Sequence, residues 1–306
     1  MAHQKREGSS TDDDCASKCL KGTDTASETG GSVEASVSQE TGTEVTRTCQ
    51  QQSEAPSEKC VLDGKAAANS KVSGEQNMVL TAVEGDAAED KGCRHTMEDA
   101  WVLLPNAGAE SPGSLRCAHF AIYDGHGGRL AADFAQKHLH QNVIAAGFPR
   151  ELMDVKAAKK AIIEGFRRTD ESLLQESSKG NWQDGATAVC VWILGQMAGG
   201  SVGSNGRLQG RIEVSRAFGE RQFKKVGLIA TPDVHSFELT KKDHFIILGC
   251  DGLWGVFGPN DAVEFVQNQL KETSSASLAV RRFVKEAVRE RRCKDNCTAV
   301  LIVFKH

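Results

Sequence analysis

Asp124 and His126 are the residues of this chain with the clearest capacity for chemistry. They follow directly on an apolar run, Phe120–Tyr123, and alternate with glycines. A run this short is typical of a buried strand, and the Asp-Gly pair predicts a turn at its end. A rigid strand end could aim the carboxylate and the imidazole at a ligand, and the carbonyl of Gly125 could itself bind one. Taken alone, the stretch also fits a common turn beside a surface histidine.

Further carboxylates occupy similar positions beside other apolar runs. Asp251 follows the run Phe245–Cys250, and Asp295 precedes the C-terminal run. Glu98 and Asp99 precede the run Trp101–Leu103. Oxygen ligands of this kind suit hard divalent cations such as Mg²⁺ and Mn²⁺. No His/Cys cluster has the spacing of a zinc site. The carboxylates therefore predict a site for hard cations, although an acidic pair such as Glu98-Asp99 is more often simply solvated.

Two ions held in this way could activate a water molecule for an in-line displacement at phosphorus. An arginine complements phosphate through paired hydrogen bonds, and Arg94 lies just before the Glu98-Asp99 pair. The pattern therefore predicts metal-assisted hydrolysis of a phosphate ester. A nuclease or nucleotide hydrolase is disfavoured, because the sequence has neither a basic strip nor a phosphate-binding P-loop.

The elements that must position these side chains follow from apolar periodicity. Strands are expected over 101–103, 117–123, 185–195, 245–250 and 297–304. Helices are expected over 128–146, 155–175, 259–271 and 276–291. A glycine-rich loop is expected over 199–210.

The composition divides the chain into a tail and a domain. Phe, Trp and Tyr occur only from Trp101 onward, and the first 75 residues are rich in Ser, Thr, Glu, Gly and Gln. Such a segment cannot build a core, so residues 1–75 are expected to be a disordered tail. Residues 76–306 then form the folded domain.

The remaining bulk properties limit the partners. The formal net charge of -4 gives no reason to expect nucleic acid or an anionic membrane, and no apolar segment approaches a membrane span. The N-terminus has no apolar signal core, so an intracellular protein of the cytoplasm or nucleus is expected, monomeric by default. Cys117, Cys190 and Cys250 lie in or beside apolar runs and are expected to be buried free thiols.

Six stretches of the sequence resemble the metal-dependent Ser/Thr protein phosphatases of type 2C. They occur in the order that the family has them and cover roughly residues 78–306. They are Arg94–Ala100, Tyr123–Gly128, Gly185–Ala188, Ser215–Glu220, Cys250–Trp254 and Lys294–Thr298. The resemblance implies an α+β fold, in which two antiparallel β-sheets form a sandwich flanked by α-helices. It also implies Mg²⁺- or Mn²⁺-dependent hydrolysis of phosphoserine and phosphothreonine in proteins by a metal-activated water.

The resemblance assigns a role to each matching residue. Two metal ions would be held by Glu98, Asp124, the Gly125 carbonyl, Asp251 and Asp295. Asp99 would orient a metal-bound water, and Arg94 would bind the substrate phosphate. His126 would protonate the leaving alkoxide, which suits a side chain that titrates near neutral pH. Asn296 would shape the loop around Asp295.

The resemblance breaks after Gln196. Family members continue there through a hairpin, a further segment and a helix, whereas here Gln196 joins Met197 directly. A few dozen expected residues are absent, including an aspartate that the family uses for an additional, weaker metal. Glu220 also stands where Asp is usual, and Gly255 stands where some members carry Asp. Loss of central strands is expected to expose strand edges and to reduce stability.

Two functions therefore stay open for the chain. The first is an active phosphatase, favoured because Arg94, His126 and the carboxylates are all present. The second is a catalytically impaired phosphatase-like module that still binds phosphoproteins, favoured by the missing strands. A shortened product, for example from exon skipping, is our hypothesis for the gap.

Overall fold

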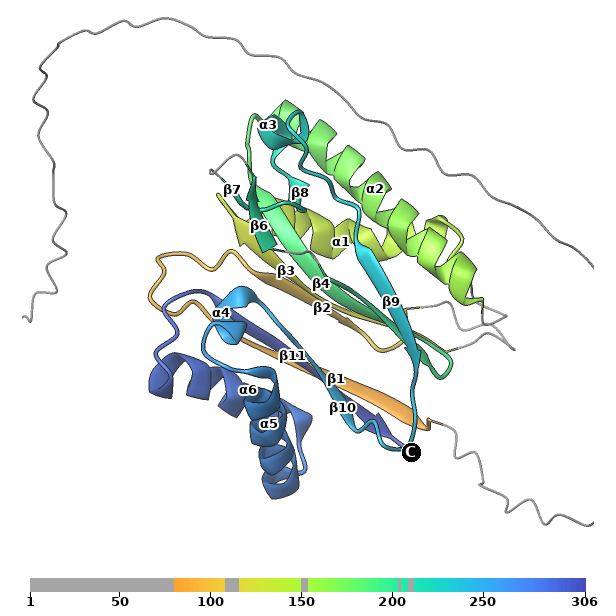
Figure 1. Cartoon of the computed structure of the whole chain (residues 1–306), viewed down its shortest axis with the longest axis vertical. Helices are drawn as coiled ribbons and strands as arrows, with labels where there is room; N and C mark the ends of the chain where they lie inside the picture. Colours follow the sequence, from red (N-terminus) through yellow and green to blue (C-terminus); the bar gives the residue numbers. More distant parts are fainter. Residues whose placement is uncertain (1–79, 108–115, 150–153, 203–204, 209–211) are drawn as a thin grey trace, which may run out of the picture. The chain divides into compact units, whose positions relative to one another are not determined.

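The computed structural model describes residues 80–107, 116–149, 154–202, 205–208 and 212–306 (Figure 1). The expected disordered tail, residues 1–75, lies outside these ranges and stays a prediction. No helix in the described ranges is long and apolar enough to cross a membrane.

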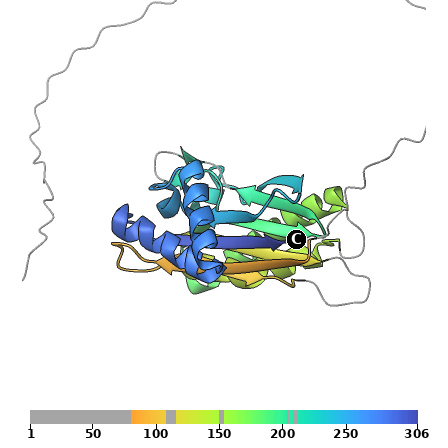
Figure 2. The same ribbon diagram turned by 90° about the horizontal axis from the view of Figure 1, so that it is seen from below.

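The strands form two antiparallel sheets and a small hairpin. The first sheet has the order β1-β11-β10, from Ala82–Asp90, Cys297–Lys305 and Phe245–Gly249. Figure 2 shows β1 in orange alongside β11 in dark blue. The second sheet has the order β2-β3-β4-β5-β9, with β8 also paired to β4. Its strands are Ala100–Leu104, Cys117–His126, Gly185–Leu194, Met197–Val202, Asp233–Glu238 and, for β8, Phe218–Gly219. The hairpin joins β6 and β7, Asn205–Leu208 and Ile212–Val214.

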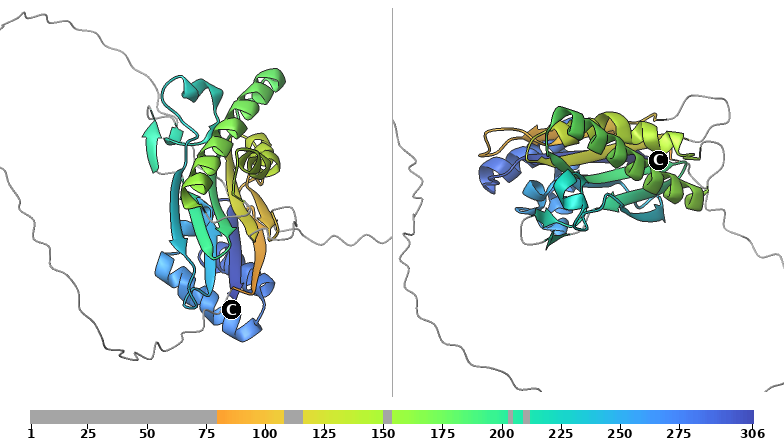
Figure 3. Two further views of the ribbon diagram at one scale, coloured as in Figure 1. Left: turned by 90° about the vertical axis from the view of Figure 1, so that its right-hand side faces the viewer. Right: turned by 90° about the horizontal axis from the view of Figure 1, so that it is seen from above.

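Helices cover the outer face of each sheet, which gives four layers (Figure 3). α1 (Leu130–Ala145) and α2 (Val155–Gly180) pack on the second sheet. α5 (Pro259–Thr273) and α6 (Ala276–Lys285) pack on the first. Three short helices complete the described fold: α3 (Arg221–Lys224), α4 (Asp251–Trp254) and η1 (Glu286–Glu290), the last continuing α6.

The central core lies between the two sheets. Phe120, Ile122 and Ile193 of the second sheet face Val300 and Ile302 of the first, and each is at most 1% exposed. Burial of large aliphatic and aromatic side chains on the inner faces is the main stabilisation of such a sandwich. The α+β sandwich implied by the sequence is therefore confirmed.

The helices α2, α5 and α6 begin at the residues that the sequence predicts, and local signals mark their starts. The Asp154 side chain accepts hydrogen bonds from two backbone N–H groups in the first turn of α2. The Ser275 side chain accepts one from Leu278 in α6, and α5 starts with Pro259 at its first position. The Asp154 and Ser275 side chains satisfy backbone donors that have no partner within the helix, and Pro259 has no N–H that needs one.

Three sequence expectations need correction. The strand predicted to end at Asp124 continues to His126, because Asp124–His126 pair with residues 185–187 of β4. β1 was not predicted, because its sequence is rich in alanine and acid, and it forms by pairing with the apolar strand β11. The glycine-rich segment expected as a loop from 199 instead contains β5, which begins at Met197.

β5 also changes the expected effect of the missing residues. Gly195, in the left-handed conformation with φ of 62°, turns the chain from β4 straight into β5. β5 pairs with β4 on one side and with β9 on the other. The edge of β4, expected to be exposed by the gap, is therefore covered.

Candidate active site

The predicted site residues meet at one end of the two sheets. Glu98 and Asp99 precede β2, whose first residue Ala100 pairs with Tyr123 next to Asp124. β10 leads into Asp251, and Asp295 precedes β11. Antiparallel pairing thus places an end of one strand beside the start of the next, which brings distant carboxylates to the same edge.

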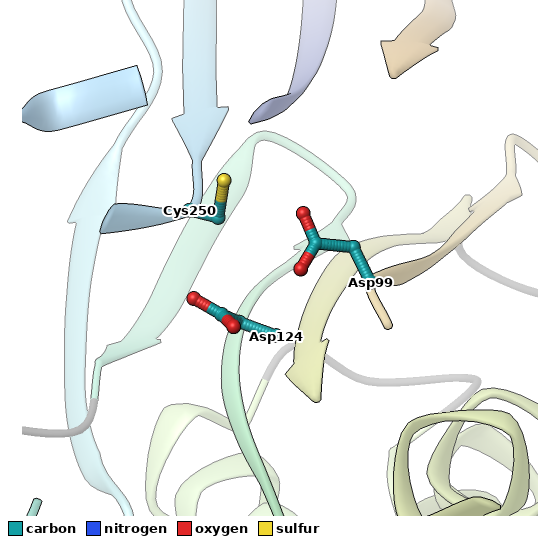
Figure 4. Close-up of side chains that lie close together, drawn as sticks. All are labelled: Asp99, Asp124 and Cys250. Carbon is teal, nitrogen blue, oxygen red and sulfur yellow. The ribbon is translucent and has the colours of Figure 1, made fainter. Parts of the chain in front are cut away.

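Asp99, Asp124 and Cys250 form the tightest group at this edge. Carboxylate oxygens of the two aspartates and the sulfur of Cys250 all lie within 4.8 Å of one another. Figure 4 shows the three side chains projecting from separate elements into a common space. Among the described residues, this is the group whose spacing could hold a metal ion.

The carboxylates of this group resist ionisation in the absence of a cation. Burial, with the charges of Asp99 and Asp251, raises the pKa of Asp124 to about 8. Burial raises the pKa of Asp99 to about 6, although a hydrogen bond of 2.5 Å from the Thr298 hydroxyl opposes that rise. The pKa of Asp251 is raised by burial and by Asp295. A divalent cation would relieve this repulsion, so the residues present fit one.

Asp99 adds a second indication of a bound cation. It is 1% exposed, and within the described part of the chain its Oδ1 atom is buried without a hydrogen-bond partner. A buried carboxylate oxygen left without a donor is costly unless a cation or water supplies the missing interaction.

Glu98 is held beside the group by backbone and side-chain contacts. Its N–H donates to the Asn296 side-chain oxygen at 2.8 Å, and its Oε2 accepts from the backbone of Gly128 at 3.2 Å. The Glu98 carbonyl lies so close to Gly125 that a Cβ there would come within 2.3 Å of it. Glycine is thus required at position 125, because the loop of Glu98 packs directly on the end of β3.

Asp251 and Asp295 are brought together by an equally close backbone contact. A Cβ on Gly252 would lie 2.0 Å from the Asn296 carbonyl, so the turn after β10 packs tightly on the loop before β11. Arg94 donates a hydrogen bond of 2.7 Å from Nη2 to Asp295 Oδ2. The Arg94 side chain is 62% exposed, so its guanidinium stands at the mouth of the site.

His126 lies two residues after Asp124, at the end of β3. Its Nε2 is 3.3 Å from Oε1 of Glu220, which follows β8. The segment that carries Glu220 is anchored by Asp170 of α2, which accepts a hydrogen bond from Gly219 and pairs with Lys224 at 2.7 Å. The sequence match at Ser215–Glu220 is thus placed beside the predicted general acid.

The structure therefore brings together most of the residues that the sequence singled out, and it adds others. Cys250 was predicted only as a buried thiol, which is confirmed, but its contact with the carboxylates was not foreseen. Thr298 was part of a matching motif without an assigned role, and it binds Asp99. Thr298 is a buried polar residue near the start of a largely apolar strand. Its position next to Asp295 and Asn296 could have signalled a contact with the site.

Comparison with known proteins identifies the family to which the chain belongs. The family model described as "Protein phosphatase 2C" matches residues 83–198 and 196–297. The chain is 64% identical to "Probable protein phosphatase 2C 67" of Oryza sativa subsp. japonica, over 367 aligned positions that cover 100% of both chains. It is 33% identical to "Integrin-linked kinase-associated serine/threonine phosphatase 2C" of Homo sapiens, over 74% of each chain.

Two features of these matches bear on the gap after Gln196. The two segments matched by the family model meet at residues 196–198. The alignment with the rice relative is 61 positions longer than the 306 residues of this chain. That relative therefore contains residues for which this chain has no counterpart.

Solved structures share the fold at low sequence identity. The crystal structure of a serine-threonine phosphatase 2C from Toxoplasma gondii superposes with a TM-score of 0.65 at 18% identity. The superposition covers 74% of this chain and 96% of that one. The family match, the close relatives and the fold agree, and the chain belongs to the protein phosphatase 2C family of serine/threonine phosphatases.

Proposed function

We propose that this chain hydrolyses phosphoserine and phosphothreonine in proteins with the help of two Mg²⁺ or Mn²⁺ ions. The observation that carries the proposal is the carboxylate cluster, in which burial and mutual repulsion raise the pKa of Asp124 to about 8. Such a cluster is unfavourable without cations and is suited to hold them.

The ions would be held by Glu98, Asp124, the Gly125 carbonyl, Asp251 and Asp295. When bound, they would supply a nucleophilic water and would neutralise charge on the phosphoryl group. Asp99, in the buried centre of the group, would accept a hydrogen bond from that water and orient it.

Two further side chains would act on the substrate. Arg94 is largely exposed and would exchange its bond with Asp295 for a phosphate oxygen, to which guanidinium binds strongly. His126 would donate a proton from its ring to the leaving serine or threonine oxygen. Glu220, 3.3 Å from Nε2, would orient the ring for that step.

We also propose that residues 76–306 form the catalytic domain, shortened near 196–197, and that residues 1–75 are a tail outside it. β5 supports a shortened but folded domain, because it pairs with the edge of β4 directly after the junction. The shortened sheet is consistent with a folded domain that keeps the site.

The second candidate function is a catalytically impaired module that binds phosphoproteins. It is favoured by the division of the family match at residues 196–198, which marks the loss of family residues close to β4. Both functions predict phosphopeptide binding, and only the first predicts turnover.

Phosphate release from a phosphothreonine peptide tests the proposal on the full chain. Turnover is expected with Mg²⁺ or Mn²⁺ and not with a chelator. Asp124→Asn should abolish it, whereas Asp133→Asn should not, because Asp133 lies on α1 and pairs with Arg129. His126→Gln should lower kcat by about 10²–10⁴, the usual contribution of a general acid. A chain that unfolds cooperatively yet shows no turnover would support the impaired module instead.

A further inference from the structure

Two loops at the mouth of the site carry basic side chains that the proposed chemistry does not use. The loop before β2 and the loop before β11 lie side by side (Figure 1). The Cys93 N–H donates to the Lys294 carbonyl at 3.1 Å. A Cβ on Gly92 would come within 2.3 Å of the Asp295 carbonyl, so the two backbones are in close contact. Segments far apart in the chain thus form one surface beside a proposed metal ligand.

The loops carry three exposed cations that have no partner of their own. Within the described residues, their side chains form neither an ion pair nor a hydrogen bond. These cations are Lys91, Arg292 and Lys294, and we call them the basic rim. The other cations of the loops are paired, Arg94 with Asp295 and Arg291 with Asp261. Because the two loops are distant in the chain, the sequence itself shows no basic strip.

Arg292 occupies a backbone position that usually selects glycine. It follows η1 with a φ of 60°, and the next N–H, of Cys293, donates back to the Ala287 carbonyl at 2.9 Å. Glycine is preferred in this left-handed position after a helix, because a side chain there is strained. The favourable effect of a cation at a helix end offsets part of the strain. A strained residue whose side chain contributes no contact within the described fold is typical of a binding surface.

We propose that the basic rim binds acidic side chains of the substrate that flank the phosphorylated residue. Phosphoproteins with Asp or Glu beside the phosphoserine or phosphothreonine would therefore be preferred. The inference rests on the proposed function, in which Arg94, on the same loop as Lys91, binds the phosphate. Residues of an extended peptide follow one another at about 3.3 Å. The neighbours of the phosphorylated residue thus lie within the distance of about 8–10 Å over which exposed charges attract each other in physiological salt.

The charge at these loops differs from that of the chain as a whole. The formal net charge is -4, so the chain as a whole gives no attraction for an acidic segment. Asp90 and Glu290 are the exposed acidic residues next to the rim in sequence, and in the described part of the chain neither forms an ion pair with it. Divalent cations bound in the site would add positive charge at the same mouth.

Two phosphothreonine peptides that differ only at the flanking positions test the proposal on the full chain. One peptide carries glutamate on both sides of the phosphothreonine, and the other carries glutamine there. The acidic peptide should have a lower KM, by up to about fivefold for each charge pair it forms, at a similar kcat. The difference should shrink in 1 M NaCl, where the screening length is only about 3 Å.

Variants of the rim show whether these residues cause the preference. Lys91→Gln, Arg292→Gly and Lys294→Gln each remove one cation, and each should reduce the ratio of the two KM values. Turnover of the glutamine peptide should keep its parental kcat/KM. Arg292→Gly also relieves the left-handed strain, so this variant should fold at least as well as the parent. Lys160→Gln is the matched control, because Lys160 is an exposed lysine on α2, outside both loops.

Binding measurements separate this inference from the proposed function. If neither peptide is hydrolysed, the affinities of the labelled peptides, measured by fluorescence anisotropy, decide. Tighter binding of the acidic peptide, lost when all three rim residues are replaced, would support the basic rim while contradicting the proposed function. Equal KM values, a preference that persists in the triple variant, or no binding of either peptide would overturn the inference.

Discussion

The side chain of Asn296 accepts the backbone N–H of Glu98 at 2.8 Å, although the two residues are 198 positions apart in the chain. The same side chain donates to the carbonyls of Lys91 and Thr96, at 3.1 and 2.9 Å. One amide thus ties the loop before β2 to the loop before β11. Two proposed metal-binding segments are held in place by a residue that was predicted to shape a loop.

Substitution of Asn296 should therefore affect both segments at once. Asn296→Ala leaves one N–H and two carbonyls without their partner, so the free energy of unfolding should fall by about 1–3 kcal/mol. Urea denaturation measures this loss, and Mg²⁺ affinity should fall about 10–100-fold in the same variant. A variant with parental stability and Mg²⁺ affinity would contradict the role of Asn296.

Removal of divalent cations should destabilise the chain in a pH-dependent way. The pKa of Asp124 is about 8 in the folded chain, above its ordinary value of 3.8. The metal-free folded state thus holds a proton that the unfolded state has lost, and its stability falls as pH rises from about 4 through 8. Saturating Mg²⁺ should raise the Tm more at pH 8 than at pH 6, because at pH 8 fewer carboxyl groups of the cluster must lose a proton before they bind the cation. Equal shifts at both pH values would argue against the cluster as the binding site.

His119 should make the fold sensitive to acid. It is fully buried on β3, its ring centroid lies 4.0 Å from that of Trp192 in a stacked arrangement, and the His140 ring centroid lies 6.5 Å away. Burial lowers the pKa of His119 to about 3 from 6.5. As pH falls, His119 takes up a proton in the unfolded state before it does so in the folded state. The stability that neutral, buried His119 contributes is therefore complete above pH 6.5 and is lost as pH falls towards 3. The lowered pKa of His119 corresponds to a stability change of a few kcal/mol across this range, because each pKa unit is worth about 1.4 kcal/mol.

Urea midpoints between pH 4 and 7 check this assignment. His119→Phe should show a flatter pH dependence than the parent, because the phenyl ring has no proton to gain. His244→Phe, at an exposed histidine, should keep the parental slope. Parallel curves for His119→Phe and the parent would show that other groups cause the acid sensitivity.

The ion pair between Lys224 and Asp170 should be needed to hold the segment of Glu220. Lys224 also donates to the Ala217 carbonyl, and both charged side chains are mostly buried. Lys224→Met leaves the Asp170 carboxylate without its counter-ion, so stability should fall by about 3–5 kcal/mol. Lys225→Met, at the exposed neighbouring lysine, should change stability by less than about 0.5 kcal/mol. Similar melting curves for the two variants would rule out a structural role for the pair.

β5 can be tested at Ala198, which is 1% exposed in the core between the sheets. Ala198→Asp places an unpaired charge there and should destabilise the chain by about 3–5 kcal/mol. Gln196→Asp, in the turn just before β5, should be tolerated. Tolerance of Ala198→Asp would mean that the segment is the loop expected from its glycines.

The local sequence determined a large part of this protein. Apolar periodicity located α1, α2, α5 and α6, and the apolar runs placed Asp124, Asp251 and Asp295 near strand ends. These signals are local, because the spacing of apolar residues within a short segment indicates a strand or an amphipathic helix. The membership of the phosphatase family followed from the ordered motifs.

Only the tertiary structure decided what the distant segments do to one another. Gly199 and Gly200 indicate a loop by propensity, yet they form β5 because β4 and β9 supply hydrogen-bond partners on both sides. The sulfur of Cys250 meets Asp99 and Asp124 because the two sheets pack face to face with these strand ends together. Contacts between residues far apart in sequence depend on packing and register, which no local pattern contains.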